Sequence, residues 1–404
     1  MFDPIKASKE IKDSYIDYIT TTFDMADTDY EREFRKELQT DGMVASGPFL
    51  DIGGSYETGH TLRELIQAQK ASILFENLEP VAEKERELKL DRPLYQHQET
   101  AMLKAGKGEN LVVTTGTGSG KTESFLLPII NHLLREQEAG TLSAGVRAII
   151  IYPMNALAND QMKRMRALFK NYPQICYGVY NGNTEHTQSK ALAEYHRTYH
   201  DEAGEPIDPA PNEIISREAM QEKPPHILIT NYSMLEYMML RPKDDAVFSG
   251  AKLKFIVLDE AHIYKGATGM ETSLLMRRLR ARISEPDSVQ YILTSATLGG
   301  PDADGDILSF AEKLCGVAFQ RSGIIRSTEK RPAMEDFLDF APALFEELQR
   351  SPDISSVLAR YHADFAPGGS EGEKLYALFL HSRLFALLRK VAHQPITVAQ
   401  LRQA

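Results

Sequence analysis

A glycine-rich segment at residues 115–122, TGTGSGKT, constrains this chain more than any other feature. It begins at the end of an apolar run, Leu111–Thr115, and precedes a segment with helical character. Closely spaced glycines let backbone N–H groups turn inward around phosphate oxygens, and the helix N-terminus adds a favourable dipole. The segment therefore predicts a nucleotide-phosphate loop. Its residues are Thr115, Gly116, Thr117, Gly118, Ser119, Gly120, Lys121 and Thr122.

Two side chains of this loop carry specific chemistry. Lys121 places a positive charge on the β- and γ-phosphates of a nucleoside triphosphate, and the Thr122 hydroxyl is expected to be a ligand of Mg²⁺. The general pattern of such loops has glycine at position 115, where this chain has threonine. ATP and Mg²⁺ are therefore the expected cofactors.

The acidic segment DEAH at residues 259–262 directly follows the apolar run Phe255–Leu258. A carboxylate at the C-terminal end of a buried strand can hold magnesium through water, and we assign that role to Asp259. Glu260 is expected to orient and deprotonate the attacking water. Together with the phosphate loop, the segment predicts an ATP hydrolase. Its catalytic residues are Lys121, Asp259, Glu260 and His262.

Two further segments accompany these sites. Gln98 lies at the start of an expected helix and offers a paired donor and acceptor that can read the edge of adenine. Ser295 and Thr297 belong to a Ser-Ala-Thr segment at the end of the strand-like run Tyr291–Thr294. Their hydroxyls are expected to bond to His262 and to report the state of the nucleotide.

Apolar runs rich in valine and isoleucine alternate with helical segments across the middle of the chain. This pattern predicts an α/β fold with a parallel sheet that is buried on both faces. The predicted strands are Leu111–Thr115, Val146–Tyr152, Ile175–Tyr180, Ile227–Thr230, Phe255–Leu258 and Tyr291–Thr294.

Three regions are expected along the chain. Residues 90–326 form the nucleotide-binding domain, with a polar insertion at 183–225. Residues 1–89 form a small N-terminal accessory region, and residues 327–404 form a helical region. A capping-box pattern at Thr397–Gln400 predicts that a helix begins just before the last residue. Because the sequence stops just inside this element, we expect the helical region to be truncated.

Composition excludes several classes of protein. The 57 acidic residues and 46 Lys plus Arg give a net charge of −11, which excludes attachment to nucleic acid by bulk charge alone. Two cysteines are too few for a disulfide framework. No apolar run approaches the roughly 18 residues that span a membrane, and the first ten residues lack a signal-peptide pattern. We expect a soluble, cytoplasmic protein without a membrane partner.

The ordered set of segments resembles the first RecA-like lobe of a superfamily 2 helicase of the DEAD/DEAH-box type. The matching segments are LYQHQ, TGTGSGKTE, YPMNALANDQ, YNGNT, TNYSML, DEAH and SAT, which cover residues 90–300. Three longer segments are similar in sequence to large bacterial DNA helicases: TTGTGSGKTESFLLPI, TNYSMLEYMMLRP and DEAHIYKGATGMETSLLMRRLRAR. These are the mitomycin-repair (YprA-like) helicases and those of the Druantia and DISARM anti-phage systems.

The resemblance implies which residues contact nucleic acid. In the family, two segments touch the sugar-phosphate backbone of the tracked strand, and a glycine-containing segment supports the same groove. The implied contacts here are Pro153, Asn155 and Gln161, then Gly182, then Thr230 and Asn231. The family also uses a second RecA-like lobe, in the same chain or in another, to complete the catalytic site with an arginine.

Two basic stretches are weighed as further phosphate contacts. The cluster Arg277, Arg278, Arg280 and Arg282 is interpreted as the solvated face of a helix. A second basic stretch follows the first backbone-binding segment and consists of Lys163, Arg164 and Arg166. Both interpretations of this stretch stay open: phosphate contacts and surface charges.

The expected function is ATP-dependent translocation along or unwinding of nucleic acid, most readily DNA, in phage defence or DNA repair with partner proteins of those processes. Because no second lobe is recognised in these 404 residues, we expect this chain alone to turn over ATP slowly. Three alternatives stay open: a nucleotide-gated interaction module without motor activity, an RNA helicase, and the motor lobe of a restriction enzyme, for which no paired-carboxylate nuclease motif is apparent in these residues.

Overall fold

The structure is a computed structural model. It describes residues 3–23, 25–40, 42–50, 56–78, 88–116, 118–170, 172–201, 203–296, 299, 301–330, 337–392 and 396–401. The chain divides into two compact units. The sheet unit spans Tyr56–Glu329, and the terminal unit combines Met1–Ser55 with Lys330–Ala404.

The sheet unit is organised around a sheet of eight strands, counted within the described residues, in the order β11-β4-β10-β9-β5-β8-β6-β7. Neighbouring strands are parallel throughout. The predicted α/β fold with a parallel sheet is therefore confirmed. The strands are β4 (Leu111–Thr114), β5 (Ala148–Ile151), β6 (Tyr177–Tyr180), β7 (Glu213–Ile214), β8 (Ile227–Thr230), β9 (Phe255–Leu258), β10 (Gln290–Ser295) and β11 (Ile324–Arg326).

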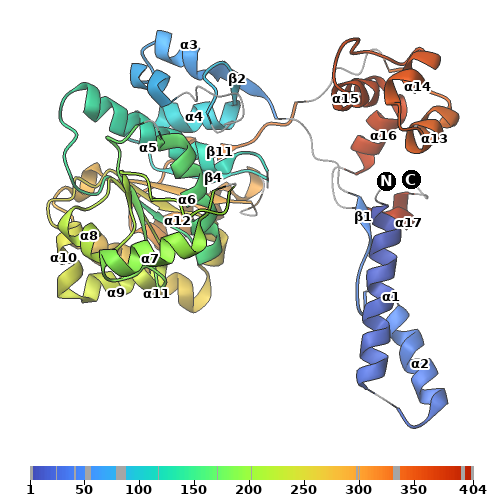
Figure 1. Cartoon of the computed structure of the whole chain (residues 1–404), viewed down its shortest axis with the longest axis horizontal. Helices are drawn as coiled ribbons and strands as arrows, with labels where there is room; N and C mark the ends of the chain where they lie inside the picture. Colours follow the sequence, from blue (N-terminus) through green and yellow to red (C-terminus); the bar gives the residue numbers. More distant parts are fainter. Residues whose placement is uncertain are drawn as a thin grey trace. The chain divides into compact units, whose positions relative to one another are not determined.

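Both faces of this sheet are buried, because alternate residues of each strand enter different apolar cores. In β5, Ala148 and Ile150 belong to one core, whereas Ile149 and Ile151 belong to the other. Helices α3, α4 and α5 cover the first core, and α9, α11 and α12 cover the second (Figure 1). The continuous apolar runs in the sequence reflect this double burial.

The helices of the sheet unit connect successive strands. They are α3 (Leu62–Gln67), α4 (Gln96–Ala105), α5 (Lys121–Glu138), α6 (Asn155–Phe169), α7 (Gln188–Thr198), α8 (Arg217–Glu222), α9 (Tyr232–Leu240), α10 (Asp245–Phe248), α11 (Gly266–Arg282) and α12 (Asp304–Cys315). A short antiparallel pair, β2 (Thr58–Thr61) with β3 (Pro93–Tyr95), lies beside them.

The boundary of this unit differs from the expected division between residues 89 and 90. Residues 56–78 belong to the sheet unit, because Leu62, Leu65 and Phe75 are buried in the core that α5 also enters. At the other end the unit continues to Glu329 rather than stopping at residue 326. The charged segment that suggested a linker, residues 83–89, lies mostly outside the described residues.

The segment 183–225 was expected to be an inserted excursion from the sheet. Instead it contains α7, α8 and β7, and β7 extends the sheet by pairing with β6. A strand of two residues leaves no periodic signal in the sequence. Arg166 of α6 holds this segment through an ion pair of 2.6 Å with Glu213 of β7.

The terminal unit contains the remaining elements. They are α1 (Pro4–Thr22), α2 (Thr28–Gln39), β1 (Phe49–Leu50), α13 (Pro342–Arg350), α14 (Ile354–Arg360), α15 (Glu371–His381), α16 (Arg383–Val391), β12 (Ile396–Thr397) and α17 (Val398–Leu401). The apolar run 375–391 is divided into two helices by Ser382, whose side chain caps α16. Among the described residues no helix has the length and apolarity to cross a membrane.

Candidate ATP and nucleic-acid sites

The phosphate loop joins β4 to the N-terminus of α5. Gly118 and Gly120 have φ values of +76° and +72°, a left-handed conformation that strains other L residues. A Cβ on Gly120 would come within 2.3 Å of Gln98 Nε2, so the close approach also requires glycine. The base of the loop is fixed by Ser119 Oγ, which donates to Thr115 Oγ1 at 2.7 Å. Thr117 lies outside the described residues.

Lys121 is the first residue of α5 and reaches the acidic segment. Its Nζ donates to Glu260 Oε1 at 3.0 Å, and the two side chains are 11% and 24% exposed. Glu260 has a φ of +48°, which a residue with a side chain rarely adopts. Such backbone strain gathers at functional sites. The structure thus joins the two segments on which the catalytic prediction depends.

Asp259 lies at the end of β9, beside the Thr294 side chain. The Thr294 hydroxyl donates to Asp259 Oδ1 and accepts from the Glu260 N–H at 3.3 Å. Burial raises the pKa of Asp259, and the charge of Glu260 adds to this rise, while the bond from Thr294 opposes it. Positive charge near Asp259, such as a bound cation, would lower that pKa again.

His262 contacts the Ser-Ala-Thr segment, as expected. Its Nδ1 lies 3.1 Å from Ser295 Oγ and 3.3 Å from Glu260 Oε2. The backbone of Ser295 also accepts from the Thr115 N–H at 3.2 Å. Ser295 is therefore bonded to both the phosphate loop and the acidic segment. Thr297 lies outside the described residues.

Gln98 is 2% exposed and uses both ends of its amide within the protein. Its Nε2 donates to Gly120 O at 3.0 Å, and its Oε1 accepts from the Tyr95 N–H at 2.9 Å. The adjacent His97 has Nε2 2.9 Å from Ser119 O. Both side chains therefore brace the phosphate loop, and in this arrangement the amide of Gln98 faces protein groups rather than an open adenine site.

The predicted nucleic-acid contacts fall into two groups. Asn155 begins α6 and Asn231 caps α9, and Asn231 Nδ2 donates to Asn155 Oδ1 at 2.8 Å. This bond joins the two predicted backbone-binding segments at the carboxyl ends of β5 and β8. Pro153 precedes Asn155 and is half-buried.

Of the remaining predicted contacts, Thr230 and Gln161 are less available for a ligand, whereas Gly182 is open. Thr230 is 1% exposed, and its hydroxyl donates to Tyr180 O at 2.7 Å. Gln161 Oε1 is buried without a hydrogen-bond partner among the described residues. Gly182 is exposed, and a Cβ there would meet nothing within 4 Å, so this position leaves room for a strand.

A model of the DEAD/DEAH box helicase family matches residues 95–202 and 207–304. These two ranges make up just over half of the chain. The chain belongs to the DEAD/DEAH box helicase family.

Individual relatives support this family assignment. Druantia protein DruE of Escherichia coli is 33% identical over 80% of this chain and 22% of DruE. The uncharacterized ATP-dependent helicase YprA of Bacillus subtilis is 30% identical over 54% of this chain and 24% of YprA. The chain thus spans about a fifth to a quarter of these relatives. The DEAD-box helicase Mss116, solved bound to ssRNA and UDP-BeF, has a TM-score of 0.50 and 17% identity over 78% of this chain and 56% of that chain, and shows the fold alone.

The helicase-family site has a donor set that fits Mg²⁺. Within the described part of the chain, no group of three or more His, Cys, Asp or Glu side chains could hold a metal by itself. Nucleotide-bound Mg²⁺ needs only one or two protein ligands, because phosphates and water supply the rest. Thr122, in the first turn of α5, and Asp259 match that requirement.

The basic stretches pair mainly with acidic residues of the same chain. Arg164 bonds to Glu123 at 2.8 Å, and Arg166 to Glu213. In the α11 cluster, Arg280 pairs with Asp287 at 2.6 Å. Arg278 and Arg282 also have acidic partners, and Arg277 donates to backbone and to Ser273. These ion pairs favour surface and structural roles over phosphate contacts.

Two residues of the site were not predicted from the sequence. Thr294 follows Leu293, which is in register with Leu258, so the strand pairing places it beside Asp259. Only knowledge of which strands are neighbours could have found it. Tyr56 forms an aromatic cluster with Tyr95 and His97, and a Cβ on Gly116 would come within 2.9 Å of its hydroxyl.

Proposed function

We propose that this chain is the ATP-binding part of an ATP-dependent helicase or translocase that acts on DNA. The observation that carries the proposal is the 3.0 Å contact between Lys121 and Glu260, which joins the phosphate loop to the acidic segment. Asp259 and the His262–Ser295 contact lie at the same edge of the sheet. This is the arrangement that phosphoryl transfer to water needs.

Each side chain has a defined task in this proposal. Lys121 leaves Glu260 and binds the β- and γ-phosphates, since a phosphate offers it more negative charge than one carboxylate. Glu260, released from this ion pair, orients the attacking water and accepts its proton. Thr122 and Asp259 would hold Mg²⁺, which supplies positive charge against the charge that develops on the phosphates.

The nucleic-acid part of the proposal rests on Asn155, Asn231 and Gly182. The bond between the two asparagines fixes the segments that precede α6 and α9 relative to each other. Backbone N–H groups at helix N-termini are suited to phosphate oxygens. Similarity to Druantia protein DruE favours a role in phage defence, and DNA repair, which the sequence resemblance also implies, is the second role.

We further propose that this chain alone turns over ATP slowly, because the family completes its site with an arginine from a second RecA-like lobe. An arginine finger contributes roughly 10³–10⁵ in rate. The partner that supplies it is a second lobe, in the same full-length protein or in another molecule.

Steady-state ATP hydrolysis tests the proposal, with and without single-stranded DNA or RNA of equal length and at equal salt. We expect tight MgATP binding at the phosphate loop, slow turnover, and stimulation by DNA above RNA, and Lys121→Ala should lose the binding at this loop together with the turnover. Glu260→Gln should keep MgATP binding while losing turnover. If RNA stimulates more strongly than DNA, the substrate is RNA. ATP binding without any response to either polymer would support a nucleotide-gated interaction module instead.

A further inference from the structure

A basic cavity of about 670 Å³ lies at the edge of the sheet opposite to the phosphate loop. Lys254 directly precedes β9, and Gln290 begins β10, so both mark the amino ends of these strands. Arg135 follows Lys121 by 14 residues along α5, about 21 Å at ~1.5 Å per residue. The cavity is therefore separate from the ATP site. We define the basic cavity by Lys70, Lys107, His132, Arg135, Lys254 and Gln290.

The charged side chains that line this cavity, among the described residues, are all basic. Among the described residues that line it, five are basic and none is acidic. The acidic residues on neighbouring segments are held by other groups. Glu136 pairs with Arg147 at 2.9 Å, Glu138 accepts from Ser72 Oγ at 2.5 Å, and Glu109 pairs with Lys104 at 3.4 Å. Apart from His132, which contacts Glu136 at 3.4 Å, the basic side chains of the cavity have no acidic partner in the part of the chain that the structure describes.

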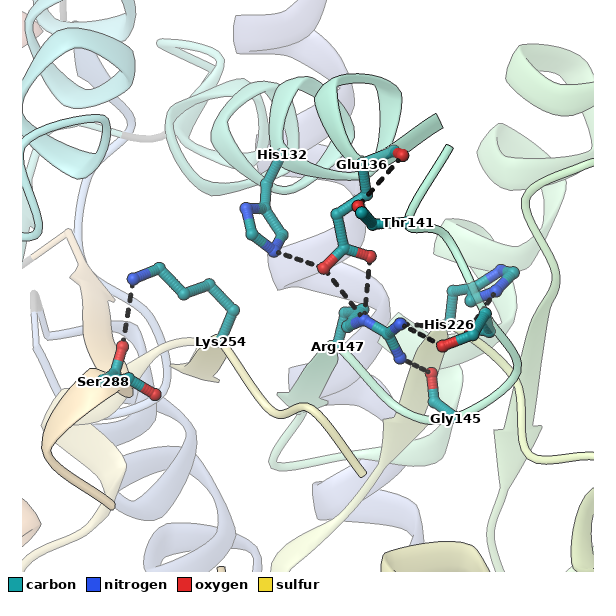
Figure 2. Close-up of polar contacts among 9 residues, drawn as sticks. His132, Glu136, Thr141, Gly145, Arg147, His226, Lys254 and Ser288 are labelled. Carbon is teal, nitrogen blue, oxygen red and sulfur yellow. Dashed lines mark hydrogen bonds and ion pairs between the residues drawn. The ribbon is translucent and has the colours of Figure 1, made fainter. Parts of the chain in front are cut away.

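Two polar groups at the cavity have unused hydrogen-bonding capacity. Lys254 is half-buried and gives one of its three N–H groups to Ser288 O at 3.1 Å, as Figure 2 shows. Burial lowers the pKa of Lys254. Gln290 is 3% exposed, and its Oε1 has no hydrogen-bond partner among the described residues. Since the two ends of a glutamine amide are interchangeable by rotation, Gln290 can present N–H groups to a ligand.

The wall of the cavity is held rigid by a polar network (Figure 2). His132 contacts Glu136 at 3.4 Å, and Glu136 bonds to Arg147, which is fully buried. Arg147 donates further to Gly145 O at 2.8 Å. This network fixes the second half of α5, which carries His132 and Arg135, against the start of β5. The two basic side chains of α5 are thus carried on a fixed segment before a ligand arrives.

The last carbonyls of α4 do not oppose an anion at this place. Lys104 O accepts from the Lys107 N–H at 2.9 Å, and Ala105 O accepts from the Gly108 N–H at 3.0 Å. These carbonyl oxygens therefore already accept hydrogen bonds from backbone N–H groups of the chain. Met102, Leu103 and Pro128 add an apolar wall, which suits the uncharged portion of a ligand.

We propose that the basic cavity binds a small phosphorylated molecule of nucleotide size, independently of the phosphate loop. A phosphate group satisfies the unused donors, and the apolar wall receives a base or a similar group. Nucleic acid fits less well, because the phosphates of a strand cannot readily enter a concave site to reach a half-buried lysine. The predicted backbone contacts Asn155 and Asn231 also lie at the opposite edge of the sheet.

Equilibrium dialysis with labelled ADP and Mg²⁺ tests this inference by counting bound equivalents. Wild-type protein should bind two equivalents, and Lys121→Ala should keep the one at the basic cavity. The double variant Lys107→Ala/Lys254→Met should bind the cavity equivalent at least tenfold more weakly and keep the other. Lys252→Met is the matched control, because Lys252 is an exposed lysine two residues from Lys254 that does not line the cavity.

The single variant Lys107→Ala guards against misfolding, because Lys107 is exposed in a loop, and it should weaken the cavity equivalent alone. Tripolyphosphate, tested in the same way, shows whether phosphate alone suffices or the base is needed. One equivalent in wild type, or two in the double variant, would overturn the inference. So would a single-stranded oligonucleotide that loses affinity in the double variant while ADP does not.

Discussion

Breaking the buried ion pair between Arg147 and Glu136 should destabilise the sheet unit. Arg147 is 0% exposed, and its guanidinium donates to Glu136 at 2.9 Å, to Gly145 O at 2.8 Å and to Ser143 O at 3.1 Å (Figure 2). Removing one partner of a buried ion pair costs roughly 3–5 kcal/mol, because the other charge stays buried and uncompensated. We therefore expect Glu136→Gln to lower the free energy of unfolding by about 3 kcal/mol.

The double variant separates the ion pair from its surroundings. Arg147→Met should also cost about 3 kcal/mol, since it leaves two backbone carbonyls without donors. Glu136→Gln/Arg147→Met should cost about 2 kcal/mol less than the sum of the single changes, because no lone charge is left. The exposed pair Arg278–Glu236 is the control, and Glu236→Gln should cost under ~1 kcal/mol.

The assay is urea unfolding followed by circular dichroism and tyrosine fluorescence, because the chain has 17 tyrosines and no tryptophan. The chain has two compact units, so hydrogen exchange of β5 and β8 amides assigns the loss to the sheet unit. Additive costs in the double variant would refute the reasoning. A cost in Glu136→Gln no larger than in Glu236→Gln would refute it as well.

Three further outcomes follow from the contacts of the site. Gln98→Ala removes the bond to Gly120 O of the phosphate loop and the bond from the Tyr95 N–H, and binding of a fluorescent ATP analogue should weaken about tenfold, or about 1.4 kcal/mol; unchanged affinity would argue against a bracing role. Asn231→Ala removes a helix cap and the bond to Asn155, so affinity for single-stranded DNA in a binding titration should fall while ATP affinity holds. Burial lowers the pKa of His97 and of His226, so protons bind more readily to the unfolded chain. The stabilisation is present above the unfolded value near ~6.5 and is lost as pH falls below it; urea midpoints at several pH values should show this loss, and His226→Gln should reduce it.

The strands that the sequence predicted correspond closely to those in the structure. Ile227–Thr230 and Phe255–Leu258 have the predicted bounds, and the others differ by one or two residues at their ends. They could be predicted because a strand buried on both faces must be apolar throughout. β7 and β11 have two and three residues, which is too short for any pattern to mark them.

The site was predictable only to the extent that motifs identify residues. Lys121, Glu260, His262 and Ser295 were named from motif types, and the structure brings them into contact. The residues outside the motifs that contact them could not be predicted, because these contacts depend on the order of the strands in the sheet. The orientation of Gln98 could not be predicted either, because the residue type alone does not show whether its amide is exposed or buried.

The order β4-β10-β9 explains why Ser295 contacts both the phosphate loop and the acidic segment, as the predicted coupling role requires. β4 carries the phosphate loop and β9 carries the acidic segment, so the strand between them touches both. The Ser295 carbonyl holds the Thr115 N–H, and its hydroxyl holds His262. We expect a shift of the loop on phosphate binding to reach His262 through the contacts of Ser295, and phosphates that bind Lys121 to compete with its ion pair to Glu260. Coupling between nucleotide and acidic segment thus follows from strand adjacency and needs no long-range path.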